Sequence, residues 1–401
     1  MNSAPLRVGD VIEITTERLA YGGDAIARHE GLAIFVPFAA PDERLRVRVT
    51  QRKKNFARAV IDSVLEPSNS RREPPCQYFG SCGGCQLQHL TYPAQLNAKV
   101  GFVRDALERI GGLKEYPEIQ IRHLDEFKYR GRAQIKIDHL NGRVGFNRAS
   151  TIEVCDIKAC PILVPDLDEA LRTVRMKVGD VLKKRDQSSP RSQIEIAAGD
   201  SGISFEPALK ELAHSPLQRT VRGAIYRFGA ATFFQANPGL LEDLIEAAVG
   251  VESGDLAIDL YAGVGLFSIQ LGRRFSRVIG VEADKTSAEF GRENVTANGL
   301  TNIEFHQSAV DSWLKRGIET SRMRADLVVL DPPRGGASEA LHGIIELEPS
   351  RITYVSCDPT TLARDLRVLT GSGYDVAGVT AIDLFPQTYH VETIAKLERA
   401  V

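Results

Sequence analysis

The chain has 401 residues, of which 25% are charged and 43% hydrophobic, and its formal net charge is −2. This composition is typical of globular protein and excludes a low-complexity or disordered chain. A chain of this length can form two or three domains. No run of about 18 apolar residues and no basic-then-apolar start occurs, so we expect no membrane segment and a cytoplasmic protein. The net charge gives no global sign of a nucleic-acid partner, although local basic patches can still bind an anion.

Residues 1–68 are predicted to form a small β-barrel, because short apolar or alternating runs are separated by glycine and proline turns. The runs are Val8–Ile14, Leu32–Val36 and Leu45–Val49. In the third run, Arg44, Arg46 and Arg48 alternate with apolar residues, so the three arginines share one face of the strand. Such a face can follow an RNA phosphate backbone, or it can be an ordinary solvated face with one acid nearby, Glu43.

Six cysteines are too few for a disulfide scaffold in a chain of this length, and their clustering indicates metal binding or catalysis. Cys76, Cys82 and Cys85 lie in one loop, in which two glycines allow a tight fold-back. A fourth ligand can come from Cys155 or Cys160. Four thiolates suit zinc or an iron–sulfur cluster, and the spacing does not separate the two. A disulfide is the alternative, which a cytoplasmic setting disfavours.

Residues 69–214 are predicted to form a central α+β domain. Pro93–Ile110 has apolar residues at helical spacing, and Tyr129–Ile137 alternates as a strand. One side of this strand carries Arg130, Arg132, Gln134 and Lys136. That side is compatible with RNA contact, and equally with an edge strand that charge protects from pairing.

Residues 215–401 are predicted to form a doubly wound α/β domain, because short apolar runs alternate with helical segments. The runs are Leu256–Leu260, Val278–Val281, Ile303–Phe305, Leu327–Leu330, Ile352–Val355 and Val376–Ile382. In a parallel sheet, ligands and reacting groups collect at the carboxyl ends of the strands. We therefore look for the site in the residues that follow these runs.

The first run is followed by a glycine turn with Gly263 and Gly265, and the second run ends in Glu282. The glycines allow the close backbone approach that an adenosine-containing cofactor needs. Glu282 lies where a nucleotide-binding sheet places the acid that contacts the ribose hydroxyls. No third glycine follows at dinucleotide spacing, so no pyrophosphate cradle is expected. S-adenosylmethionine is therefore favoured over NAD.

Two later strand ends carry further candidates. Asp331 opens a stiff Asp-Pro-Pro-Arg loop, where it can contact the cofactor or the substrate; the alternative is a cap for a helix predicted over 338–345. Cys357 lies between the fifth strand and the helix that follows. A thiolate at this junction is a candidate nucleophile, and a buried structural thiol is the alternative.

Together these motifs resemble the RNA 5-methyluridine methyltransferase family of the TrmA and RumA type. The resemblance covers nearly the whole chain in family order: a TRAM-like β unit, Cys-x5-Cys-Gly-Gly-Cys, Phe233-Phe-Gln-Ala-Asn-Pro-Gly, Asp-Leu-Tyr-Ala-Gly-Val-Gly, Asp-Pro-Pro-Arg, Tyr-Val-Ser-Cys-Asp-Pro and the closing Asp383-Leu-Phe-Pro-Gln-Thr-Tyr-His-Val-Glu-Thr. It implies a Rossmann-like methyltransferase domain that uses S-adenosylmethionine. It also implies RNA as the partner and no obligate protein partner.

The resemblance further implies roles for individual residues. A four-iron four-sulfur cluster would be held by Cys76, Cys82, Cys85 and Cys160. S-adenosylmethionine would be bound by Gln235, Tyr261, Glu282 and Asp331, beside Gly263 and Gly265. Cys357 would be the nucleophile and Glu392 the base, with His390 as a competing base that lacks family precedent. Two positions depart from the family: Asp358 replaces the usual Asn and should oppose thiolate formation at Cys357, and Leu266 replaces an Asn of some relatives.

The expected reaction explains why these groups are needed together. Addition of the Cys357 thiolate to carbon 6 of a flipped uracil makes carbon 5 nucleophilic toward the sulfonium methyl, and Glu392 then removes the proton at carbon 5. Three alternatives are methylation of cytosine carbon 5, methylation of an amino group at the Asp-Pro-Pro-Arg loop, and a non-catalytic RNA-binding iron–sulfur protein. The sequence leaves open which RNA and which uridine is modified, what the cluster does, and the oligomeric state.

Overall fold

The computed structural model describes residues 6–183, 191–207, 216–320 and 324–400. It divides into two compact units. The first is Met1–Phe102 with Phe146–Cys155 and Phe385–His390; the second is Val103–Gly145 with Asp156–Leu384 and Val391–Val401. Each unit is described on its own. The three-part division at residues 68 and 214 stays a prediction.

The first unit contains the predicted β-barrel, which is confirmed. Its five strands close in the order β1-β2-β3-β5-β4. They are β1 (Val11–Leu19), β2 (Ala25–His29), β3 (Leu32–Val36), β4 (Arg44–Arg52) and β5 (Phe56–Glu66). Ile34, Leu45 and Val47 are fully buried in the barrel core. Closure leaves no long open edge, which keeps a small sheet from pairing with other chains.

The arginines of β4 lie on one exposed face, as period-two geometry predicts, but each has a carboxylate partner. Arg44 pairs with Glu13 at 3.0 Å and with Glu66 at 2.8 Å. Arg46 pairs with the same Glu13, and Arg48 pairs with Asp62 at 3.0 Å. The acids come from β1 and β5, which flank β4 in the barrel. This face is therefore a charge-balanced network and not an uncompensated basic track.

Glu43, the acid nearest to the arginine run in the sequence, takes no part in that network. Its side chain is fully buried, and it accepts hydrogen bonds at 2.8 Å from the Ala40 amide and from the Arg71 guanidinium. The same guanidinium also donates to the Phe38 carbonyl at 2.9 Å. This buried ion pair therefore fixes the Phe38 turn and the segment after β5 to the barrel.

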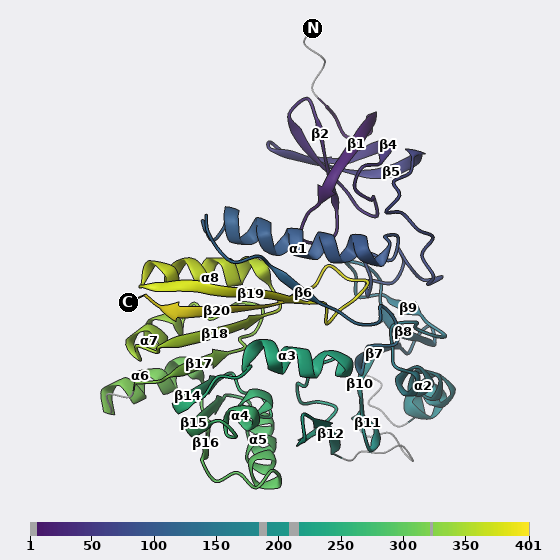
Figure 1. Cartoon of the computed structure of the whole chain (residues 1–401). Helices are drawn as coiled ribbons and strands as arrows, with labels where there is room; N and C mark the ends of the chain where they lie inside the picture. The colour runs from purple at the N-terminus through teal and green to yellow at the C-terminus, as the bar shows by residue number, and fades with distance from the viewer. Residues whose placement is uncertain (1–5, 184–190, 208–215, 321–323, 401) are drawn as a thin grey trace. The chain divides into compact units, whose positions relative to one another are not determined.

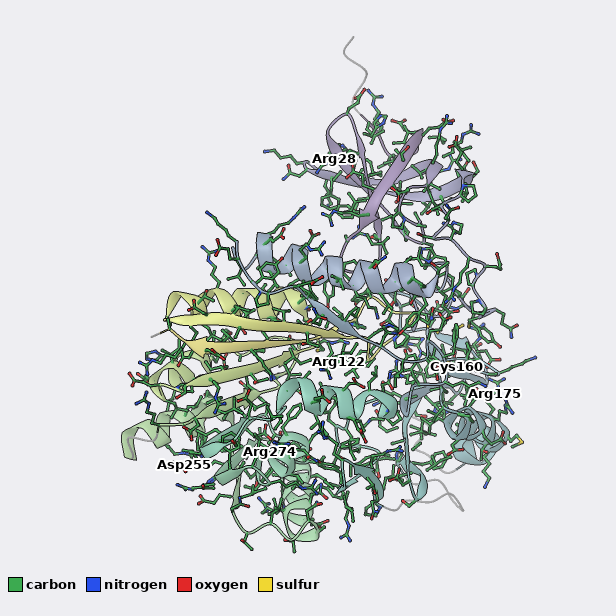
Figure 2. All side chains as sticks on the ribbon, viewed as in Figure 1. Arg28, Arg122, Cys160, Arg175, Asp255 and Arg274 are labelled. Carbon is green, nitrogen blue, oxygen red and sulfur yellow. The ribbon has the colours of Figure 1, made fainter. Side chains whose placement is uncertain are left out.

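The second unit contains most of a five-stranded antiparallel sheet in the order β11-β10-β7-β8-β9. Its strands are β7 (Arg132–Asp138), β8 (Arg143–Asn147), β9 (Val154–Asp156), β10 (Arg191–Gly199) and β11 (Gly202–Glu206), preceded by α1 (Tyr92–Arg109) and accompanied by α2 (Pro165–Lys183). β7 pairs with β10 on one side and β8 on the other, so the edge-strand interpretation of this segment is wrong. Figure 2 labels Arg175 on α2, which pairs with Asp156.

The second unit also contains the predicted α/β sheet, whose eight strands follow the order β16-β15-β14-β17-β18-β20-β19-β6. They are β6 (Gln120–Arg122), β14 (Gly254–Leu260), β15 (Phe275–Glu282), β16 (Ile303–Gln307), β17 (Leu327–Leu330), β18 (Arg351–Ser356), β19 (Tyr374–Ile382) and β20 (Glu392–Arg399). The antiparallel hairpin of β12 (Leu217–Val221) and β13 (Ala224–Phe228) lies between β6 and β14 in the chain. No helix among the described residues is long and apolar enough to span a membrane.

Helices cover both faces of the eight-stranded sheet, which confirms the doubly wound α/β prediction. Figure 1 shows one group on one side and a second group on the other. The first group is α3 (Leu241–Ala248), α4 (Leu266–Leu271) and α5 (Lys285–Ala297), and the second is α6 (Val310–Thr320), α7 (Leu341–Glu346) and α8 (Pro359–Gly371). From β14 the chain winds outward through β15 and β16, and from β17 it winds the other way. The carboxyl ends of β14 and β17 therefore form a switch point, where such sheets bind ligands.

β20 runs antiparallel to β18 and β19. In the register, Thr393 lies opposite Ser356, and Glu392 lies opposite Ile382. Because β20 is reversed, its first residue lies at the edge where its parallel neighbours end. Glu392 is thus delivered to the same edge of the sheet as Cys357, which follows Ser356.

We predict that Arg71→Met lowers the free energy of unfolding of the barrel by about 3–5 kcal/mol, because it leaves the buried Glu43 carboxylate without its cation. Hydrogen exchange in increasing urea, read on peptides of β1 to β5, measures this loss. The matched control is Arg44→Met, which breaks solvent-exposed pairs and should leave the transition almost unmoved. Equal loss in both variants would contradict a structural role for the buried pair.

Candidate active site

The glycine turn after β14 has an unusual backbone. Tyr261, Gly263 and Gly265 all adopt positive φ, at 61°, 55° and 89°. Glycine takes this conformation without strain, whereas Tyr261 is held in it by its surroundings, which is typical of functional sites. The Ala262 amide donates to the Val281 carbonyl at 3.0 Å and thereby fixes the turn against β15.

Glu282, at the end of β15, is joined directly to this turn. One carboxylate oxygen accepts the Gly263 amide at 2.8 Å, and the other accepts the Asp284 amide at 2.7 Å. Each oxygen keeps a lone pair for a further donor. The structure therefore brings together the turn and the acid that the sequence motif predicts to bind an adenosine ribose, and it orients the carboxylate through two backbone bonds.

Asp259 lies in β14, just before the glycine turn, and the sequence analysis assigned it no role. It is fully buried, and one of its oxygens accepts the Ser268 hydroxyl at 2.5 Å. The other oxygen is buried and has no hydrogen-bond partner in the described part of the chain. Burial raises the pKa of Asp259 to about 7. Its place directly before the glycine turn was the signal that could have identified it.

Asp331 follows β17 and faces Gln235 from the loop after β13. The Gln235 side-chain amide donates to the Asp331 carboxyl at 3.5 Å, and Gln235 is 7% exposed. Burial, and after it the nearby Asp259 charge, raises the pKa of Asp331 to about 7. Asp331 does not cap the next helix, because α7 begins only at Leu341.

The loop that begins at Asp331 is anchored to the helix after the cysteine. The Asp365 carboxylate accepts the Ala337 amide at 2.8 Å and the Tyr354 hydroxyl at 2.7 Å, and it is fully buried. Arg364 donates to the Gly335 carbonyl at 2.9 Å. The Asp-Pro-Pro-Arg loop and the β18-to-α8 junction therefore form one connected substructure.

Cys357 occupies the β18-to-α8 junction, as predicted. Burial and then the Glu392 charge raise the pKa of Cys357 to about 11, while a hydrogen bond and the positive charge of Arg334 act in the opposite direction. Asp358, which was expected to oppose the thiolate, instead caps α8: its carboxylate accepts the Thr360 amide at 2.8 Å and the Thr360 hydroxyl. The carboxyls that raise the cysteine pKa are those of Glu392 and Asp331.

Glu392 is 3% exposed, and burial followed by the Asp331 charge raises its pKa well above the ordinary value. Asp331 thus interacts electrostatically with Asp259, Glu392 and Cys357. A group of buried acids that resist ionisation is suited to a cationic ligand, since a nearby positive charge lowers each pKa. The buried Asp259 oxygen that has no hydrogen-bond partner in the described residues is also suited to a cationic ligand.

Other predicted site residues divide between the units. Cys76, Cys82 and Cys85 belong to the first unit, and Cys160, labelled in Figure 2, belongs to the second. All four cysteines have intermediate exposure. Over residues 6–183, 191–207, 216–320 and 324–400, no three Cys, His, Asp or Glu side chains already form a metal-binding group. The competing base His390 lies in the first unit, whereas Glu392 lies in the second.

The loop before Gln235 shows a contrast that the sequence did not reveal. Phe233 is 64% exposed, whereas the adjacent Phe234 is 4% exposed and stacks on Phe228 with ring centroids 4.4 Å apart. One aromatic ring thus anchors the loop, and the other is presented to solvent two residues from Gln235. Exposed aromatic rings of this kind can stack on nucleobases.

We predict that alkylation of Cys357 by iodoacetamide accelerates about tenfold per pH unit between about pH 7 and pH 10, because only the thiolate reacts and its pKa lies above this range. Arg334→Met should slow the reaction at each pH, since it removes the cation that favours the thiolate. Peptide mass spectrometry measures the rate at Cys357 alone. Arg367→Met, an exposed change on α8, is the control. A rate that levels off near pH 8 would show that the thiol is not suppressed.

Comparisons with known proteins agree with this geometry. A family model of tRNA (uracil-5-)-methyltransferases matches residues 208–400, and a TRAM-domain model matches residues 5–61. An uncharacterized RNA methyltransferase of Aquifex aeolicus is 35% identical, covering 96% of this chain and 98% of its own. The 23S rRNA (uracil(1939)-C(5))-methyltransferase of Pectobacterium atrosepticum is 31% identical, covering 96% and 93%. The crystal structure of Pyrococcus abyssi tRNA (uracil-54, C5)-methyltransferase with S-adenosyl-L-homocysteine has a TM-score of 0.73 at 25% identity, covering 96% and 100%.

Proposed function

The chain belongs to the S-adenosylmethionine-dependent RNA (uracil-5-)-methyltransferases, and we propose that it methylates carbon 5 of an RNA uridine through a covalent adduct on Cys357, with Glu392 as base. The observation that carries this proposal is the reversal of β20, which brings Glu392 to the edge where Cys357 lies. The two groups interact, since the Glu392 charge raises the cysteine pKa.

In the proposed reaction, the Cys357 thiol first releases its proton to solvent, and Arg334 favours the thiolate that remains. The Cys357 thiolate forms a bond to carbon 6 of uracil, and the electron pair of the ring double bond moves into an enolate. Carbon 5 then forms a bond to the methyl group, whose bond to the sulfonium sulfur breaks. Glu392 takes the proton from carbon 5, the double bond is restored and the thiolate is expelled.

Electrostatics explains the order of these steps. In the free site, burial and the Glu392 charge raise the pKa of Cys357 to about 11, and burial with the Asp331 charge raises the pKa of Glu392. Formation of the carbon–sulfur bond removes the thiolate charge. Glu392 can then ionise and accept the carbon 5 proton. Arg334 stabilises the thiolate at the stage before addition.

We propose that S-adenosylmethionine is held by Gln235, Tyr261, Gly263, Gly265, Glu282 and Asp331. Glu282 faces the glycine turn with both oxygens oriented by backbone amides, which suits ribose hydroxyls. The buried Asp259 and Asp331 carboxyls favour a cation nearby. When bound, this cofactor supplies the electrophilic methyl group. Phe233 offers a ring on which the flipped uracil can stack.

The prediction that tests this proposal uses tritium release from uracil carbon 5, with unmodified ribosomal-RNA and transfer-RNA pools offered separately. Wild-type enzyme should release tritium from one pool, and Cys357→Ala should release none, because no adduct can form. The pool that reacts identifies the RNA class, for which an rRNA-modifying relative and a tRNA-modifying structural neighbour are both known.

Glu392→Gln separates the role of the base from the role of the nucleophile in the same assay. It retains the nucleophile but cannot take the proton, so the RNA should stay attached to the protein through Cys357 and resist denaturing electrophoresis. Tritium release by Cys357→Ala at the wild-type rate would overturn the covalent mechanism. Family membership sets aside the cytosine and non-catalytic alternatives, because the matched families act on uracil.

We also propose that Cys76, Cys82, Cys85 and Cys160 hold a four-iron four-sulfur cluster. Four cysteine thiolates are a suitable donor set for such a cluster, and all four residues are partly exposed. The Cys82 sulfur accepts the Gly84 amide at 3.4 Å, the kind of bond that stabilises cluster sulfurs. No step of the proposed reaction transfers an electron, so the cluster would serve structure or RNA docking. We further propose that the enzyme is cytoplasmic and that its partner is RNA.

Cys160→Ser is predicted to remove the visible absorbance of protein purified without air and to lower the thermal stability of the central region, because a cluster ligand is lost. Cys155→Ser is the matched control, since Cys155 is the other cysteine near this position and is buried at 3% exposure. It should keep the colour. A brown, fully stable Cys160→Ser protein would exclude this residue as a ligand.

A further inference from the structure

Arg132, at the start of β7, is partly exposed like Gln134 and Lys136, but its guanidinium is bonded to another loop of the protein. Its guanidinium donates to the Ala230 carbonyl at 2.9 Å and also to the Thr232 carbonyl. Burial lowers the pKa of Arg132 to about 10, so the group is still charged at neutral pH. The neighbouring Lys136 instead reaches out to Gln193, in an exposed contact.

The two carbonyls belong to the loop that carries Phe233 and Gln235. The residue before Arg132 holds the other end of this loop, because the Gly131 amide donates to the Ala236 carbonyl at 2.6 Å. β7 itself lies between β10 and β8, and its residues are hydrogen-bonded on both sides. The loop is therefore tied at both ends to an interior strand of a packed sheet.

Between these ties, the loop is anchored by one buried aromatic ring, because Phe234 stacks on Phe228. The Thr232 hydroxyl bonds back to Gly229. Gln235 reaches Asp331 through a long contact of 3.5 Å, which is too weak to set the position of the loop by itself. The fork of Arg132 is the group that fixes the backbone on the amino-terminal side of Phe233.

We propose that Arg132 is a positioning residue of the methyltransferase, whose guanidinium holds the Ala230–Ala236 loop so that Phe233 and Gln235 meet the base and the cofactor. The proposal rests on the role inferred above for Gln235. A planar fork can serve two carbonyls at once, whereas a lysine ammonium is a point donor on a flexible stem. The basic residue that the sequence assigns to an RNA-facing strand thus acts inside the protein.

The experiment compares Arg132→Lys and Arg132→Met with Arg273→Met in the tritium-release assay. Arg273 is a matched control because its guanidinium also bonds two backbone carbonyls, those of Arg222 and Gly223, but it follows α4 at the opposite edge of the sheet from the glycine turn. We expect kcat to fall about 100-fold in Arg132→Met, less in Arg132→Lys, and not at all in the control.

RNA binding separates this role from a phosphate contact. A positioning residue leaves the slope of log affinity against log salt unchanged, whereas loss of one phosphate contact reduces that slope by about 0.7–0.9. A double-mutant cycle with Gln235→Ala gives the second readout. If Arg132 acts through the loop, Arg132→Met should add little to the effect of Gln235→Ala on kcat and on cofactor affinity.

The proposal is overturned if Arg132→Met keeps the wild-type kcat, if the salt slope falls by about one contact, or if the two substitutions combine additively. Where Arg132→Met does not fold, Arg132→Lys provides the same comparison, and added methylguanidinium should restore turnover to Arg132→Ala. The affinity of an Arg132 variant for the cofactor, measured by calorimetry, reports on the position of the loop even when the variant has no turnover. Loss of turnover in the wild type would instead count against the proposed function.

Discussion

Removal of carboxyl groups from water at one edge of the eight-stranded sheet is the constraint on which this site depends. Asp259 is fully buried, and its pKa near 7 corresponds to a cost of about 4 kcal/mol for ionising it in place. The pKa values of Asp331 and Glu392 are raised as well, and the charges of both groups raise the pKa of Cys357. Each carboxyl group therefore ionises less readily than it would in water. In the mechanism proposed above, the positive charge of the sulfonium cofactor would favour the ionised form of each group.

The order and direction of the strands determine which side chains lie close to these buried carboxyl groups. The winding of β14 through β16 and of β17 and β18 in opposite directions opens the switch point, and the reversed β20 adds a carboxyl from the end of the chain. Around this edge, the supporting contacts are hydrogen bonds to backbone: Glu282 with the glycine turn, Asp365 with the Ala337 amide, and Arg132 with the loop before Gln235. The segments that carry the candidate site residues are thus held in place by bonds to backbone groups.

Local sequence patterns predicted much of this frame. β17 has the bounds expected from its apolar run, and α1 differs from the predicted helix by one residue at each end. The sequence patterns did not predict which side chains from distant segments pair with each other. The β4 arginines find partners on β1 and β5, Glu43 turns inward to Arg71, and Arg132 turns toward residue 230. Such pairings depend on strand register and burial, which no local periodicity contains. For the same reason Asp259 and Phe233 gained significance only once their exposure was known.

The capping of α8 by Asp358 has a consequence for the chemical durability of the enzyme. A helix amino terminus can stabilise a nearby thiolate, but here its first amides bind the Asp358 carboxylate, which also brings negative charge to that terminus. The cap leaves burial and the Glu392 charge to hold the pKa of Cys357 at about 11, and a protonated thiol is a form that peroxides oxidise slowly. The same electrostatics that suppress the nucleophile in the free protein therefore also protect its sulfur from oxidation.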